Sequence, residues 1–111
     1  MSRAPRLDLV GARRVDPSVG QEELEREIMR EIAAALGRSA EKVEAALARL
    51  EAGRCAIDAA TDEDARQRAV DAFEDLRAAA LRARHDLLIH REAVGFRRNG
   101  MLEAMYPIPR R

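Results

Sequence analysis

Apolar residues recur every three or four positions through most of this 111-residue chain, which is the period of an amphipathic α-helix. In the first such stretch, Ser18 and Gln21 have the spacing of a capping box, and four glutamates follow at the positive end of the helix dipole. The apolar stripe continues through Ile28 to Gly37, a residue typical of a helix C-terminus. The pattern predicts a helix over about 19–36.

A second periodic stretch begins after Ser39, which can cap a helix N-terminus. Its apolar stripe predicts a helix over about 40–60, and Gly53 lies inside that stripe. Glycine costs about 1 kcal/mol of helix propensity relative to alanine. Its position therefore indicates either a kink or the close approach of another helix, and we favour the close approach.

The longest uninterrupted helical pattern begins after Thr61, where Asp62 and the two acidic residues that follow suit a helix N-terminus. No glycine or proline occurs from 62 to 94, and the apolar residues alternate in steps of four and three, as in the seam of a coiled coil. The pattern predicts a helix over about 62–94, roughly 50 Å long against roughly 30 Å for the preceding helix.

If these two helices fold back on each other, residues at equal distances from Thr61 face one another. Phe73 then lies beside Gly53, and Val43 lies near Ala80. The longer helix extends beyond its neighbours, and its apolar C-terminal end needs a cover. The cover is the chain's own C-terminal segment, its N-terminal arm, or a second copy of the chain.

The last sixteen residues are unusually apolar for a chain terminus, with two of the three aromatic residues and two of the four methionines. Gly95 is expected to end the long helix, and Pro107 and Pro109 stop any later one. A short helix is therefore predicted over about 100–106. The composition predicts that this segment packs either on its own long helix or on that of a partner chain.

Together these patterns predict an all-α fold, either a three-helix antiparallel bundle or a helical hairpin with one long helix (about 62–94), plus a short C-terminal helix. Residues 1–17 carry four arginines and show no helical period, so they are interpreted as a mobile N-terminal arm. Residues 18–111 are then a single helical domain.

The composition predicts that the hydrophobic core is small. The chain has 22 alanines and three aromatic residues, so each helix face buries little apolar area, and oligomerisation would supply what is missing. Of its 20 basic residues 19 are arginine, which together with the alanines suggests a GC-rich bacterial genome. The longest stretch without a charge is six residues, against the roughly 20 of a membrane-spanning helix. With no secretory pattern and the single Cys55, a cytoplasmic location is expected.

Few residues suggest chemistry. Asp86 and His90 lie four residues apart on one predicted helix face, with Glu92 nearby, a spacing at which side chains can share a metal ion. In a chain that is 36% charged such pairs arise readily by chance, and the Glu-x-x-His pairs of di-iron bundles do not occur. Phosphate-binding loops and G-x-S-x-G, H-E-x-x-H and C-x-x-C motifs are also missing. Neither catalysis nor a cofactor is predicted.

The charge distribution bears on nucleic acid as a partner. Residues 1–20 carry four arginines against two acids, and residues 90–111 carry five against two. The middle, residues 21–89, has eleven basic residues against sixteen acidic ones. Nucleic-acid-binding domains usually present a net basic face, so this acidic body argues against nucleic acid.

The preferred hypothesis is a small cytoplasmic, non-catalytic interaction or scaffolding module that forms a homodimer or tetramer. The long helix would supply the seam, and the C-terminal segment would bind an acidic protein partner. The residues of that partner-binding surface are Leu87, Val94, Phe96, Arg97, Arg98, Met101, Leu102, Met105 and Tyr106. One alternative is a metal or small ligand held at a helical subunit interface by Asp86, His90 and Glu92. The other is a nucleic-acid-associated regulator that uses the arginine-rich ends.

Overall fold

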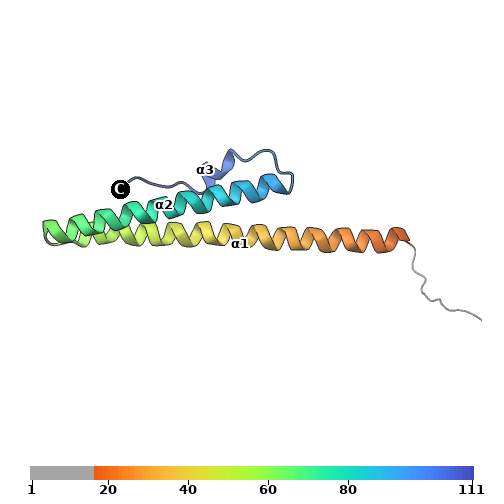
Figure 1. The fold of residues 1–111 in the computed structure, drawn as a ribbon, viewed down its shortest axis with the longest axis horizontal. Helices are drawn as coiled ribbons and strands as arrows, with labels where there is room; N and C mark the ends of the chain where they lie inside the picture. The colour runs from red at the N-terminus through yellow and green to blue at the C-terminus, as the bar shows by residue number, and fades with distance from the viewer. Residues whose placement is uncertain (1–16) are drawn as a thin grey trace, which may run out of the picture. The chain divides into compact units, whose positions relative to one another are not determined.

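The computed structural model describes residues 17–111, with side chains from residue 20 onward. It contains α1 (Pro17–Ala59), α2 (Glu63–Ala93) and α3 (Met101–Met105), and these residues include no strand (Figure 1). The all-α prediction is confirmed in its form of a helical hairpin with a short C-terminal helix. The predicted N-terminal arm lies, except for Pro17, outside the described residues. No described helix is both long and apolar enough to cross a membrane.

The predicted break between helices over 19–36 and 40–60 is wrong, because α1 continues through it for 43 residues in all. A β-carbon added at Gly37 would meet nothing within 4 Å, so this glycine neither turns the chain nor admits a neighbour. Glycine lowers the stability of a helix by about 1 kcal/mol relative to alanine. Packing offsets this cost, because Leu36 before Gly37 and Ala40 after it both contact the same buried cluster. Ser39, expected as a cap, is buried within the helix.

The helix predicted over about 62–94 is confirmed as α2, with 31 residues. Its N-cap is Asp62, whose side chain accepts a hydrogen bond from the backbone N–H of Ala65 at 2.8 Å. We had expected α2 to be the longest helix, and this prediction is wrong, because α1 has 43 residues.

The hairpin unit is the compact part Ala34–Arg111, and the earlier part of α1 belongs to a separate unit. Within the hairpin unit, α2 runs back along α1, and α3 lies on the hairpin (Figure 1). Two small buried clusters join the helices. The first contains Ala46, Leu50, Ile57, Phe73 and Ala80, and the second contains Val43, Leu87 and Leu102.

Gly53 is confirmed as a point of close approach. A β-carbon there would lie 2.7 Å from Leu76 Cδ1 and 3.8 Å from Phe73 Cδ1, so Phe73 does lie beside Gly53. The predicted pairing of Val43 with Ala80 is wrong, because Val43 shares its cluster with Leu87. The residues of α2 that pack on α1 therefore lie further from the connection than a pairing symmetric about Thr61 predicts.

The C-terminal segment packs on its own chain. Leu102 of α3 is buried with Val43 and Leu87. Beyond α3, Ile108 packs against the first cluster, while Arg84 donates to the carbonyl oxygen of Tyr106 at 3.0 Å. The segment thus covers the end of α2 that had been expected to need a partner.

Candidate functional site

The large apolar side chains that remain exposed lie in two stretches of the sequence. Among the described residues there are eight of them, and every one falls in 24–29 or in 89–105. We call the first the N-terminal stripe; its members are Leu24, Ile28 and Met29. We call the second the C-terminal patch; its members are Ile89, Val94, Phe96, Met101 and Met105.

The C-terminal patch is built around the end of α2. Gly95, with φ of +100°, takes the left-handed conformation that favours glycine. Its N–H donates to the carbonyl of Glu92 at 3.1 Å, and the N–H of Phe96 donates to that of Arg91 at 2.9 Å. These two bonds form a Schellman motif. The motif ends α2 and directs Phe96 out of the helix.

Side chains hold the turn that follows. Arg91 donates from Nε to Asn99 Oδ1 at 2.6 Å, and Asn99 Nδ2 donates to the carbonyl of Phe96 at 3.0 Å. The guanidinium of Arg91 also lies 4.6 Å from the centre of the Phe96 ring, within cation–π distance. Phe96 nevertheless stays 44% exposed. The turn therefore presents an aromatic side chain in a fixed geometry.

The structure divides the predicted partner-binding residues. Leu87 and Leu102 belong to the core of the chain itself, and Tyr106 is half-buried against it. These three therefore belong to the packing within the chain itself. The remaining members are exposed on or beside the C-terminal patch: Val94, Phe96, Arg97, Arg98, Met101 and Met105.

The proposed metal ligands Asp86, His90 and Glu92 do not come together as a site. No group of three or more His, Cys, Asp or Glu side chains placed to hold a metal occurs in the described part of the chain. His90 Nδ1 lies 3.0 Å from the hydroxyl oxygen of the buried Ser39. His90 therefore links the two helices of the hairpin.

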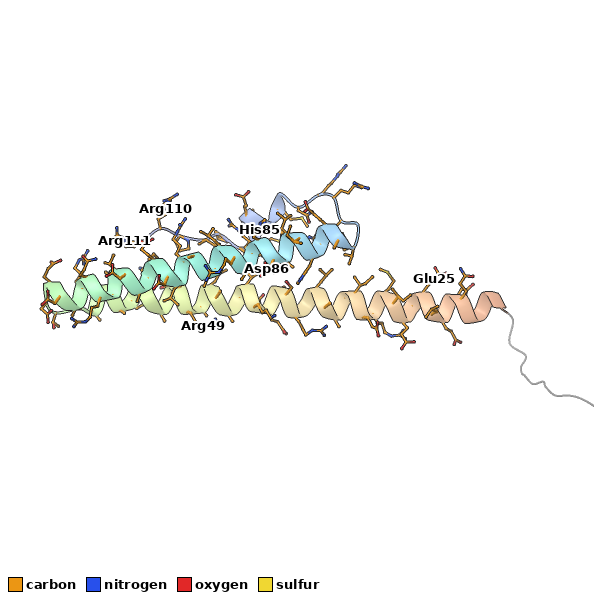
Figure 2. The ribbon with its side chains drawn as sticks, in the orientation of Figure 1. Glu25, Arg49, His85, Asp86, Arg110 and Arg111 are labelled. Atoms are coloured by element: carbon orange, nitrogen blue, oxygen red, sulfur yellow. The ribbon has the colours of Figure 1, made fainter. Side chains whose placement is uncertain are left out.

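An open hollow of about 300 Å³ lies between α2 and the start of α3. Arg84, His85, Leu88 and Glu103 contribute to its walls, and Figure 2 labels His85 on α2 beside α3. His85 and Glu103 are exposed, and Arg84 already bonds the backbone of Tyr106. This mixture of solvated charges of both signs selects no ligand class.

Cys55 lies in a small polar cluster on α1. Arg54 donates from Nε to Glu51 Oε1 at 3.1 Å, with a second contact through Nη2, and the thiol of Cys55 donates to Glu51 Oε2 at 3.8 Å. The bond from Arg54 is the main cause that lowers the pKa of Glu51 below its usual value, and the same bond raises the pKa of Arg54. This is a solvated ion pair.

The arginines near the C-terminus do not gather in one place. Arg97 and Arg98 are exposed in the turn beside Phe96. Figure 2 labels Arg110 and Arg111 along α2, where Arg111 Nε lies 3.6 Å from Glu74. The pair in the turn is thus the basic feature that accompanies the C-terminal patch.

The N-terminal stripe was not predicted as a surface, because its residues were expected to pack inside a bundle. Leu24 is 58% exposed and Met29 is 60% exposed, and every side chain over 20–31 is exposed. The surface could have been predicted if α1 had been recognised as one long helix. The expected break at Gly37 instead assigned these residues to a separate helix of a bundle.

No protein-family model, curated protein or solved structure matches the chain.

Proposed function

We propose that this chain is a non-catalytic helical interaction module that associates with a second copy of itself through the C-terminal patch. The observation that carries the proposal is the exposure of five large apolar side chains over residues 89–105. Soluble monomers scatter such residues singly, and clusters of them mark interaction surfaces. As part of the same proposal we place the module in the cytoplasm, where the unpaired Cys55 stays reduced.

The composition of the patch supports this role. Phe96, Met101 and Met105 are of the types enriched at protein interfaces, as are the neighbouring arginines Arg97 and Arg98. The hydrogen bonds of Asn99 and the Schellman motif fix the turn before any partner arrives. Less conformational entropy is then lost on binding, which strengthens association.

A second copy is the occupant that the charges favour. The chain has no net charge at pH 7, so two copies do not repel each other at long range. Its middle, residues 21–89, has sixteen acidic residues against eleven basic ones. The same chain therefore supplies an acidic surface for Arg97 and Arg98.

The test is the solution mass of the full chain and of two variants, measured by sedimentation velocity over a range of concentrations. Phe96→Asp with Met105→Asp places two charges in the patch, and association should weaken by at least about tenfold. Tyr106 is left intact because it packs against the buried core. Ala72→Asp with Ala78→Asp adds the same charges at exposed positions of α2 and should leave association unchanged.

Circular dichroism of each variant confirms that the helices are retained. A wild-type chain that stays monomeric at hundreds of micromolar contradicts the proposed function. Equal association of the wild type and the Phe96→Asp, Met105→Asp variant contradicts the role of the patch.

A further inference from the structure

We infer that the C-terminal patch of one copy binds the N-terminal stripe of a second copy, and that the contact is made twice, reciprocally, in a two-fold dimer. This inference rests on the proposed function and names the surface that the patch recognises. It follows from three features of the described residues: where the exposed apolar side chains lie, where α2 ends along α1, and how the charges are distributed.

The exposed apolar residues leave two surfaces to be matched. Every large apolar side chain that is exposed among the described residues belongs to the stripe or to the patch. The described residues offer no third group of exposed large apolar side chains that could be the partner of either surface. A contact between them would remove both from water at once, which is the favourable term in association.

The stripe lies in the part of α1 that precedes Ala34 and is outside the hairpin unit. Ser39 contacts His90, three residues before α2 ends at Ala93. The last turn of α2 therefore reaches only about one turn of α1 before Ser39. The residues of α1 that precede this point include Leu24 and Ile28, and both are exposed.

The sequence of the stripe is that of a helix face made for packing. Leu24, Ile28 and Ile32 follow one another in steps of four. A further step of seven leads to Ser39, which is buried in the hairpin, and Val43 follows in another step of four. Because steps of four and seven keep residues on one helix face, the pattern that binds α2 continues into the stripe.

Charge selects the patch, rather than a second stripe, as the partner. Residues 20–33 contain five glutamates and two arginines, so two stripes packed together would bring like charges side by side. The patch carries the exposed pair Arg97 and Arg98. Glu25, labelled in Figure 2, and Glu31 lie three residues before and after Ile28 and flank the stripe on α1. They are therefore placed to meet these arginines.

Each copy carries both surfaces, which is what a reciprocal contact requires. A two-fold axis makes the two contacts identical and closes the assembly at two chains. A single contact joins the three side chains of the stripe to the five of the patch. It buries little area compared with the roughly 1,200–2,000 Å² of a stable interface. Two such contacts double the buried area without any additional surface.

The experiment uses the full chain in sedimentation velocity, with variants on each surface. Leu24→Asp with Ile28→Asp should weaken dimerisation by at least about tenfold, as the patch variant does. The matched control Ala48→Asp with Ala52→Asp places the same charges four residues apart on exposed positions of α1. It should dimerise as the wild type does.

Charge exchange then tests whether the two surfaces touch. Arg97→Glu with Arg98→Glu should weaken the dimer, and so should Glu25→Arg with Glu31→Arg, because each places like charges across the interface. A chain that carries all four substitutions should recover most of the lost affinity. Added salt should reduce these differences.

The outcomes separate this inference from the proposed function. If patch variants lose association and the stripe variant keeps it, the proposed function stands and the inference is wrong. If both surfaces are required but the fourfold variant does not recover, the direct pairing is wrong. A monomeric wild-type chain overturns both.

Discussion

Gly53 lets Leu76 approach α1 to a distance that a β-carbon would not allow. The added carbon would lie 2.7 Å from Leu76 Cδ1, with the backbone of Phe73 at 3.9 Å. Phe73 itself is fully buried, and in a chain with three aromatic residues it is the largest side chain of the core. The contact at Gly53 therefore fixes how closely the two long helices pack.

Gly53→Leu should lower the free energy of unfolding by about 1–3 kcal/mol, because a large side chain overpacks the hairpin at this contact. Gly53→Ala should change it by less than about 1 kcal/mol, since the gain in helix propensity offsets a shift of the flexible end of Leu76. Urea denaturation followed by circular dichroism measures both. A neutral Gly53→Leu variant would contradict the close approach of the helices.

Glu51 gives a pH dependence whose sign follows from its pKa. The bond from Arg54 lowers the pKa of Glu51 in the folded chain, so its stabilising effect is present above the unfolded-state pKa and is lost as pH falls through the folded one. At neutral pH the melting temperature of the wild type should be higher than that of Glu51→Gln. The difference should be small because the ion pair is exposed. The difference should shrink in acid, and a difference that grows would contradict this assignment.

At the scale of elements, α1 is a single helix that carries the N-terminal stripe on the part before Ala34. Because it continues through Gly37, the residues before Ser39 extend the helix instead of folding back as a third one. Gly37 and Gly53 each interrupt an apolar pattern in α1, and the sequence does not show which of them meets another helix. The distinction is tertiary: Gly53 meets α2, whereas a β-carbon at Gly37 meets nothing.

Gly37→Ala should raise the free energy of unfolding by about 0.5–1 kcal/mol, because alanine is the better helix former and the added carbon has open space. Had this glycine ended a helix in the left-handed conformation, the same change would destabilise the chain. Thermal unfolding of the two proteins decides between these results. A loss of stability would contradict a continuous α1.

The sequence predicted the elements of the hairpin unit better than their pairing. Asp62 and the uninterrupted pattern after it identified α2, and Pro107 marked the end of the short helix, because these signals are local. The offset that groups Val43 with Leu87 was not predicted, since it depends on how two whole faces fit together. Phe96 was predicted to belong to the partner-binding surface, and the structure shows that it is exposed in the turn after α2.

At the scale of the whole molecule, the chain buries little and exposes two apolar surfaces. Its core consists of two small clusters, one of them completed by Leu102 from α3. The C-terminal segment therefore completes the core while its other side forms the patch. Core and surface are built from the same short segment, so association with a second copy should also stabilise the fold.

The most direct test of the account is the mass of the untagged wild-type chain, measured by light scattering behind size exclusion at several concentrations. The chain has a mass of 12.4 kDa, and we predict that the measured mass rises toward twice this value and remains there. A mass that stays at 12.4 kDa at every concentration would contradict self-association, and with it the role assigned to both surfaces.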